Sequence, residues 1–155
     1  LMDKLLKGNK LVIHDPWKRI DSPIEVFNCV DIPSFSIFPI QNFTKDYIPI
    51  SNRKIGVLFD STIDAAQINN QILSLPLLCM HVGDFQNGQM FSLAYMIKKN
   101  FRYDGELRVT GNFLIDQLPH LKRCGVDSFW INEESDWEYG INLLNQKTIK
   151  SPFFN

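Results

Sequence analysis

The most constraining feature of this sequence is a regular alternation of short apolar runs with amphipathic segments, which begins at Ile55. Four apolar runs start at residues 55, 77, 106 and 128, so that successive starts lie 22, 29 and 22 residues apart. Strands and helices that alternate at this spacing form right-handed βαβ units around a parallel sheet. The apolar character of the runs agrees with this, because helices cover the faces of a parallel sheet.

The number of strands limits the architecture further. Residues 35–40, which contain Pro39, form a fifth expected strand at an edge or with the proline at its end. A closed barrel of βα units needs eight strands, so five strands predict a part-barrel that resembles half of a TIM barrel. A flavodoxin-like open sheet, in which the strand order reverses once, is the alternative.

Helices are expected after each of these strands, and two of them carry informative residues. Ser135 and Glu138 match a capping box and predict a final helix that ends near Lys147. Pro119 leaves two possibilities for the preceding helix. In the preferred one the helix begins near Phe113 and is distorted by the proline, and in the other it begins at Asp116 with the proline in its first turn.

The N-terminal part is less regular and is expected to pack on the domain as an arm. A short strand at 10–14 is ended by Asp15-Pro16, and Trp17 and Phe27 are the expected anchors. The expected organisation is a single domain over residues 1–155, with an arm at 1–35 and a βα-repeat core at 36–148.

Composition and charge exclude several classes of partner. Sixteen basic and seventeen acidic residues leave a formal charge of −1 without a basic stripe, so no nucleic-acid partner is expected. The apolar runs are too short to cross a membrane. Three cysteines at unpatterned spacings indicate a cytoplasmic protein without disulfides. An uncovered sheet edge favours a homodimer, and the N-terminal arm is the competing cover for that edge.

Three adjoining motifs are similar to a bacterial family known as domain of unknown function 934. The first is FQNGQMFSLA at residues 85–94, the second is GELRVTGNFLIDQL at 105–118, and the third is RCGVDSF at 123–129. The second motif has the family form GELRAxGDVLxDQL. A weaker match is Asp15-Pro16-Trp17 near the start of the chain.

The resemblance implies a link to sulfur assimilation, because genes of this family commonly lie beside those of assimilatory sulfite reductase. Members are often labelled as oxidoreductases, and sulfite reductase is the partner that the resemblance implies. This chain departs from the family at four positions. Asn87 replaces an acidic residue, Gln89 an arginine, Asn112 an aspartate, and Pro119 an aromatic or apolar residue. The departures leave open whether the family's activity is retained.

The candidate site is the rim of polar residues beyond the carboxyl ends of the predicted strands. Parallel sheets hold their ligands at this edge, and an acidic rim can orient a polar molecule or hold a divalent cation. Many such residues also cap helices, which is the alternative role. The ligand- or partner-binding candidates, from this rim and from the family motifs, are Asp84, Asn87, Gln89, Ser92, Arg108, Asn112, Asp116 and Gln117.

Arg108 stands out among these residues because it lies within an apolar strand. Burial of an unpaired guanidinium is costly, so the side chain requires an acidic partner. We expect it near the carboxyl end of the sheet, paired with Asp116 or Asp84, with Asp127 as a further candidate.

Two functions remain open at this stage. The first is a non-catalytic accessory or binding protein linked to sulfite reduction, as the resemblance implies. The second is a small barrel-like enzyme that acts on a polar or anionic molecule at the rim, with a metal as a potential aid. The sequence contains no dinucleotide fingerprint, phosphate loop or nucleophile elbow, so it assigns no catalytic residue, cofactor or metal ligand.

Overall fold

The described chain forms one curved sheet with helices on one side. The computed structural model describes residues 4–20, 33–43, 54–83 and 88–146. Within them, eight strands follow the order β2-β1-β8-β7-β6-β5-β4-β3. Their bounds are β1 Lys4–Lys7, β2 Lys10–Val12, β3 Lys18–Arg19, β4 Ser36–Pro39, β5 Ile55–Asp60, β6 Leu77–Val82, β7 Glu106–Gly111 and β8 Ser128–Ile131.

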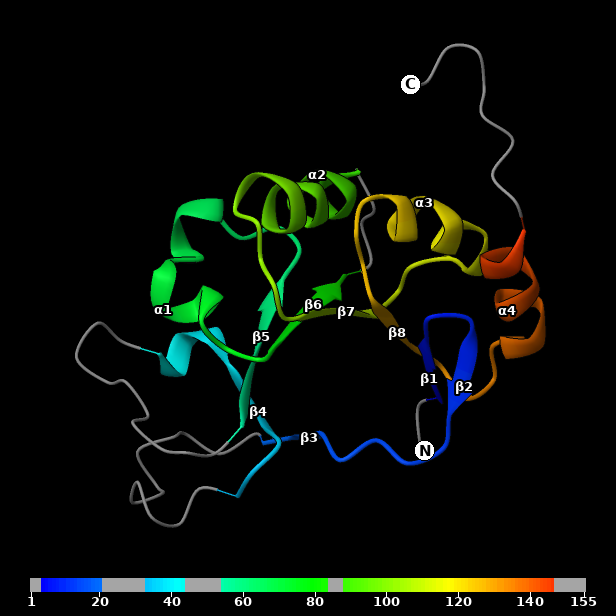
Figure 1. The fold of residues 1–155 in the computed structure, drawn as a ribbon, viewed down its shortest axis with the longest axis horizontal. Helices are drawn as coiled ribbons and strands as arrows, with labels where there is room; N and C mark the ends of the chain where they lie inside the picture. The colour runs from blue at the N-terminus through cyan, green and yellow to red at the C-terminus, as the bar shows by residue number, and fades with distance from the viewer. Residues whose placement is uncertain (1–3, 21–32, 44–53, 84–87, 147–155) are drawn as a thin grey trace.

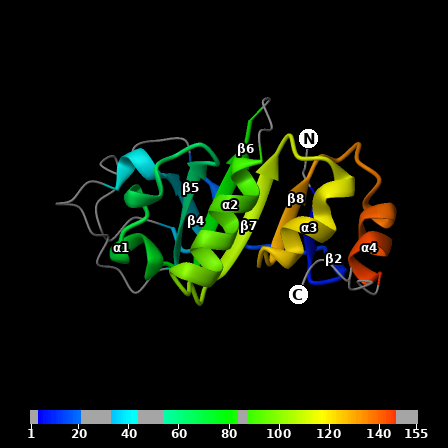
Figure 2. The same cartoon turned by 90° about the horizontal axis from the view of Figure 1, so that it is seen from above.

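The strand pairing confirms the predicted part-barrel. Neighbouring strands from β3 to β8 are parallel and follow one another in chain order, and β6 pairs with β7 in this way from Leu77 opposite Glu106. Because the order does not reverse, the flavodoxin-like alternative is wrong. The sheet curls as half of a barrel, with the helices on its outer side (Figures 1 and 2).

The helices are short and several are extended by tighter or wider turns. The α-helices are α1 Asn70–Leu73, α2 Gln89–Tyr95, α3 Leu118–Arg123 and α4 Trp137–Asn145. The 3₁₀ turns are η2 Ile40–Asn42, η3 Ala65–Gln67 and η5 Ile115–Gln117, and η4 Met96–Asn100 continues α2 as a π-helix. None of the helices in the described ranges is long and apolar enough to cross a membrane.

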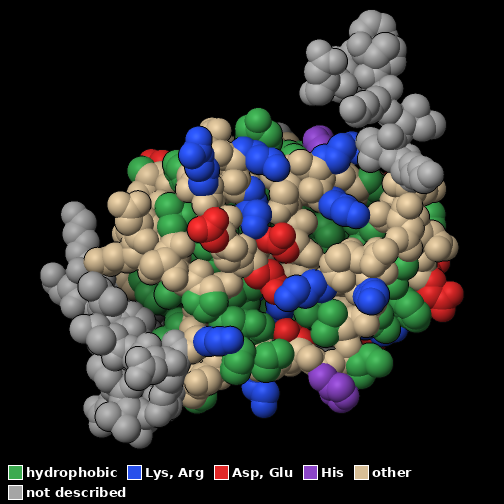
Figure 3. Space-filling view, viewed as in Figure 1, with side chains coloured by type: hydrophobic (Ala, Val, Ile, Leu, Met, Phe, Trp, Pro, Cys, Tyr) green, Lys and Arg blue, Asp and Glu red, His purple; other side chains and the backbone are tan. Residues whose placement is uncertain are grey.

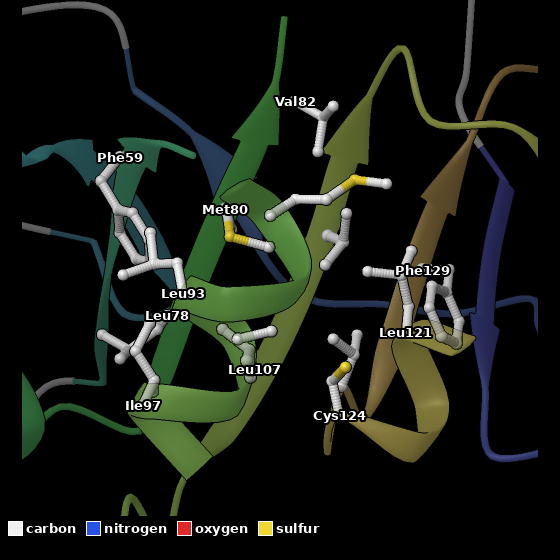
Figure 4. Packing of buried hydrophobic residues seen from close by; sticks show 14 of the residues in the cluster. Phe59, Leu78, Met80, Val82, Leu93, Ile97, Leu107, Leu121, Cys124 and Phe129 are labelled. Carbon is white, nitrogen blue, oxygen red and sulfur yellow. The ribbon is translucent and has the colours of Figure 1, made fainter. Parts of the chain in front are cut away.

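The larger hydrophobic core lies between the sheet and the helices. Alternate residues of each strand point to this side, as Leu78, Met80 and Val82 do from β6. Leu93 and Ile97 from the second helix pack against them, and Leu121 of α3 packs in the same layer (Figure 4). The repeated burial of whole apolar side chains against one sheet face is what holds the βα units together.

The inner face of the sheet carries a smaller core and a buried charged group. Ile37, Leu77 and Cys79 are fully buried there, with Trp17 and Trp130 packed against them. On this inner face β7 presents polar residues, among them Glu106 and Arg108, whereas Leu107 and Val109 point to the helices. The strand therefore alternates between polar and apolar residues, which the rule for buried parallel strands does not anticipate.

The N-terminal residues contribute three strands to the sheet. Only the strand at 10–14 was predicted, and the sequence did not place it in the sheet. β1 pairs with β8 in antiparallel register, with Leu6 opposite Phe129, and β3 pairs with β4. The predicted strand at 10–14 is β2, and the predicted anchor Trp17 packs on the inner-face core. Phe27 lies outside the described residues.

The segment that joins β2 to β3, residues 13–17, crosses between the two edges of the sheet, and we call it the strap (Figure 1). Eight strands follow an arc of roughly 34 Å, because adjacent strands lie about 4.8 Å apart. The strap spans at most roughly 22 Å from Val12 to Lys18, at about 3.6 Å per residue. The edges must therefore approach each other, and the strap closes the open side of the half-barrel.

Two local predictions need correction. The third helix does not begin at Phe113, because a 3₁₀ turn precedes α3, and Pro119 lies in the first turn of that helix, where its missing N–H costs little. The last helix is capped by Asp136 rather than Ser135, since the Asp136 carboxylate accepts a hydrogen bond from the Tyr139 backbone N–H.

Two of the three cysteines and the charges of one face can be placed in the structure. Cys79 and Cys124 are buried free thiols, and Cys29 lies outside the described residues, so the absence of disulfides stays a prediction. On the face shown in Figure 3, basic and acidic side chains are interspersed across the centre. Such a mixed face offers no continuous basic track for a phosphate backbone.

Candidate functional site

Arg108 is the centre of a buried ion-pair network on the inner face of the sheet. Only 1% of the residue is exposed. Its Nη1 and Nη2 donate to the two carboxylate oxygens of Asp15 at 2.8 and 3.2 Å, which is a bidentate arrangement. Asp15 belongs to the strap, 93 residues away in the chain.

The opposite edge of the guanidinium is held by residues of β7 and β8. Nη2 donates to Glu106 Oε2 at 2.7 Å, and Nε donates to Ser128 Oγ at 3.2 Å. Ser128 Oγ donates in turn to Glu106 Oε2 at 2.8 Å. Lys7 from β1 pairs with the other oxygen of Glu106, and the Trp130 ring lies 4.6 Å from the Arg108 Cζ atom.

The network is electrically balanced, with two carboxylates and two cations. Burial alone acts to raise the pKa of Glu106, but hydrogen bonds from Lys7 and Arg108 outweigh it, so this pKa lies below its ordinary value. Burial acts to lower the pKa of Arg108, and its bonds to Asp15 and Glu106 outweigh that effect and raise the pKa. Both groups are therefore held in their charged forms.

The predicted ion pair of Arg108 is present, but two of its predicted partners, Asp116 and Asp127, are wrong. Asp116 accepts a hydrogen bond from the Tyr139 hydroxyl instead, and Asp127 pairs with Lys98 at 2.8 Å. Asp84 lies outside the described residues. The reason is geometric: Arg108 points to the inner face from the amino half of β7, away from the carboxyl-terminal rim.

Sequence reasoning missed the residues that complete this network, although two signals were available. Glu106 and Arg108 are two positions apart in a strand, so their side chains share one face. Asp15 lies in the weak Asp15-Pro16-Trp17 match near the start of the chain. Ser128 follows from register, since it lies directly opposite Arg108. No signal in the sequence pointed to Lys7.

We expect the Glu106 carboxylate to make the protein less stable in acid. A group whose pKa is lowered by folding adds stability above its unfolded pKa of about 4.3, and this stability is lost as the pH falls through the folded pKa. Glu106→Gln should therefore reduce the loss of unfolding free energy between pH 6 and pH 3.5, measured by urea denaturation. Glu138→Gln at an exposed position should leave that loss unchanged. An equal loss in the Glu106 variant and the native chain would contradict the assignment.

The carboxyl-terminal rim is a separate place, beyond the ends of β5 to β8. A pocket of about 240 Å³ opens there after β7 and β8. Its lining is mostly backbone, amide and apolar side chains, from Gly111, Asn112, Phe113, Ile115, Ile131, Asn132 and Ser135.

Many acceptors at this rim are occupied by local turns. Asp60 Oδ1 accepts from the Thr62 backbone N–H at 3.0 Å and from its hydroxyl at 2.8 Å, which lowers the Asp60 pKa. Asn132 Oδ1 accepts from the Glu134 N–H at 3.0 Å. These bonds close local turns. The side chains that cap helices in the described residues are others, such as Asp64, Asn69 and Asp136. Among the described residues, no three His, Cys, Asp or Glu side chains gather in a way that could hold a metal ion.

The candidates from the sequence fall into separate groups. Asn112 lines the rim pocket, and Asp116 and Gln117 lie in the turn that follows it, where Gln117 Oε1 accepts from the Leu114 N–H. Gln89 and Ser92 are exposed on α2, and Arg108 is buried on the inner face. Asp84 and Asn87 lie outside the described residues. The role of each candidate in binding stays a prediction.

Two apolar side chains at the rim are exposed rather than packed. Leu114 is 60% exposed and Tyr139 is 44% exposed. Leu114 follows β7, and Tyr139 lies in α4, whose first turns contact the segment of Asp116 through the Tyr139–Asp116 hydrogen bond of 2.7 Å. The carboxylates of Asp116, Glu133, Glu134, Asp136 and Glu138 are exposed on the same two segments.

Comparison with known families decides the classification of the chain. The family model described as "Bacterial protein of unknown function (DUF934)" matches residues 56–149, which is more than half of the chain. The chain belongs to this family. No curated protein and no solved structure matches the chain.

The DUF934 match covers both places described above except for Lys7 and Asp15 of the inner-face network. Arg108, Glu106 and Ser128 lie inside the matched range, and so do the rim pocket and the exposed Leu114. Asp15 lies outside it, in the strap. The inner-face network is therefore built partly by the matched DUF934 region and partly by the N-terminal segment.

Proposed function

We propose that this DUF934 protein is a non-catalytic binding protein whose partner docks on the carboxyl-terminal rim. The observation that carries the proposal is the exposure of Leu114 and Tyr139 beside the rim pocket. Large apolar side chains that remain exposed around a hollow are typical of binding surfaces, and tyrosine is enriched among residues that dominate binding energy.

The surroundings of these side chains indicate the chemistry of the partner. The exposed carboxylates of Asp116, Glu133 and Glu134 lie on the same segments as Leu114 and the first turns of α4. Acidic groups around an apolar centre favour a partner that presents an apolar side chain flanked by lysine or arginine. The binding should therefore weaken as the salt concentration rises.

Assimilatory sulfite reductase is the proposed partner, because the family resemblance implies a role beside that enzyme. The same resemblance supports a link to sulfur assimilation for this chain. The unpatterned cysteines support a cytoplasmic location. Self-association to a homodimer is a further proposal. In the described part of the chain, β1 and β3 already pair with β8 and β4, so a dimer would have to use another surface or the outer strands β2 and β3.

Binding of the purified chain to sulfite reductase tests the proposal. We expect Tyr139→Ala to weaken binding at least about tenfold, which corresponds to about 1.4 kcal/mol. Tyr95→Ala is the matched control, because Tyr95 is 52% exposed on α2 outside the rim segments. Titration by fluorescence anisotropy or calorimetry measures both variants.

Three results would contradict this proposal. Failure of sulfite reductase to capture the native chain would exclude it as the partner. Equal loss from Tyr139→Ala and Tyr95→Ala places the interface elsewhere. Binding that is insensitive to salt removes the acidic rim as its determinant.

A further inference from the structure

The Asp15 carboxylate binds the guanidinium of Arg108 in the same way that the carboxylate of a ligand would. Both terminal nitrogens of Arg108 face the strap and contact the two oxygens of this one carboxylate. This fork-to-carboxylate geometry is the usual mode by which arginine recognises planar carboxylates. The strap itself is irregular chain between β2 and β3.

Arg108 is positioned without help from Asp15. Nε and Nη2 are bonded to Glu106 and Ser128, and the Trp130 ring lies 4.6 Å from Cζ. All of these groups come from β7 and β8, which are central strands of the sheet. The guanidinium edge that faces the strap is therefore preorganised, which lowers the cost of binding a ligand there.

The charges around Arg108 also match one monoanion. Lys7 and Arg108 carry two positive charges, and Glu106 carries one negative charge. Without Asp15 the group has a net charge of +1. The Lys7 side chain is 54% exposed, but Arg108 is buried and would lose the acceptors of its outer edge, which is costly. One carboxylate restores the balance, and Asp15 supplies it in the closed structure.

The strap is held more weakly than the strands on either side of it. Residues 13–17 make no backbone–backbone hydrogen bond within the described part of the chain. Ile13 is 80% exposed, and His14 and Pro16 are exposed as well. The strap is held by the Asp15 ion pair and by Trp17, which packs on the inner-face core and edge-on to Phe35 at 5.3 Å. Segments with few buried contacts and few backbone bonds open at low free-energy cost.

We propose that Arg108, with Ser128 and Trp130, forms a binding site for a small carboxylate, and that Asp15 of the strap is its built-in competitor. A carboxylate ligand displaces Asp15 and lifts the strap from the inner face. This site is distinct from the partner surface at the rim and does not depend on it.

Rescue of an Asp15 variant by an added carboxylate is the first test. Asp15→Ala should lower the melting temperature, because the outer edge of Arg108 loses its acceptors. Formate at 100 mM, on the order of the weak affinity of so small a ligand, should restore most of the loss, whereas chloride at the same concentration should not. Asp127→Ala, which removes a half-exposed partner of Lys98, controls for general salt effects and should not be rescued.

The second test measures how far Cys79 of β6 becomes exposed when the strap of the native chain opens. It does not require the Asp15 variant to fold. Cys79 is fully buried in the cluster on which Trp17 packs, and burial raises the pKa of its thiol to about 12, so it is unreactive while the strap is closed. In a chain with Cys29→Ser and Cys124→Ser, formate should accelerate maleimide labelling of Cys79 about tenfold at saturation, and chloride should not. A tenfold change corresponds to about 1.4 kcal/mol in the strap equilibrium.

The two tests together decide the proposal. Rescue by formate together with accelerated labelling supports an exchangeable carboxylate site. Labelling that formate does not change overturns it, even if the Asp15 variant is rescued, because a site that only a mutation opens is not a ligand site of the native protein. Rescue of Asp127→Ala to the same extent as Asp15→Ala also overturns it.

Discussion

Replacement of Arg108 by alanine is expected to destabilise the protein by roughly 3–5 kcal/mol. The side chain is 1% exposed and neutralises Asp15 and Glu106, whose side chains are each 15% exposed. Without it, Glu106 keeps its ion pair with Lys7, and Asp15 loses the two bonds that Arg108 donates to it. The loss is a large fraction of the stability of an ordinary domain, which is about 5–15 kcal/mol.

A double-mutant cycle separates the ion pair from the lost volume of the side chain. Arg108→Ala, Asp15→Asn and the double variant should show a coupling energy of about 0.5–3 kcal/mol. Arg108→Lys keeps the charge but not the bidentate fork, so its loss should be intermediate. Arg123→Ala, at an exposed position of α3, is the control and should change stability by less than about 0.5 kcal/mol.

Urea denaturation at pH 7 measures all of these variants. A loss below about 1 kcal/mol for Arg108→Ala would show that the buried network does not stabilise the fold. Additive losses for Arg108→Ala and Asp15→Asn would show that these two residues are not coupled. Either result would also show that the Asp15–Arg108 ion pair is not what holds the strap on the sheet.

The parallel βα core could be predicted from the sequence because its signals are local. Each strand from Ile55 onwards is a compact apolar run, and each following helix begins at a polar or glycine-containing junction. Register within the core follows from the same alternation, because a slip of one residue would turn Leu107 and Val109 away from the helices.

The contribution of the N-terminal segment could not be predicted in the same way. β1 and β2 are four and three residues long, and β3 has only two, so they are too short to show a period. Their place in the sheet depends on contacts more than 100 residues away, such as Leu6 opposite Phe129. Arg108 shows the same limit: burial required an acidic partner, but only the tertiary structure identifies Asp15 as that partner.

The rim illustrates a different limit. The sequence identified polar residues at the strand ends, and many of them serve as turn acceptors, as Asp60 and Asn132 do. The exposure of Leu114 and Tyr139 could not be foreseen, because many apolar residues lie on protein surfaces and the sequence does not show which of them are packed. Only the tertiary structure shows that these polar groups are hydrogen-bonded while the apolar side chains beside them are exposed.

Gly111→Ala is the second substitution with a large expected effect. Gly111 has a φ of +103°, which residues with a side chain rarely adopt. A Cβ atom at this position would collide with the Val82 carbonyl oxygen and lie 2.9 Å from the Val82 nitrogen. Both obstacles are backbone atoms of the neighbouring β6, so they cannot rotate away as a side chain would.

The close approach exists because β7 and β6 stay paired to their last residues. Gly111 lies opposite Val82, and the Asn112 N–H donates to the Val82 carbonyl at 2.8 Å. Strain of about 1–3 kcal/mol from the backbone and about 1–3 kcal/mol from overpacking predict a loss of roughly 2–6 kcal/mol in total. The chain should relieve the collision by displacing the Asn112 segment, which also deforms the rim pocket.

Gly88→Ala is the matched control for this prediction. Gly88 also has a positive φ, of +82°, but no atom of the described residues lies within 4 Å of the added Cβ atom. Its loss should therefore be the backbone strain alone, about 1–3 kcal/mol, and smaller than that of Gly111→Ala. Thermal and urea denaturation of both variants measure the difference. Equal losses would show that contact with Val82 is not what requires glycine at 111, and that the conformation of the backbone is sufficient to explain it.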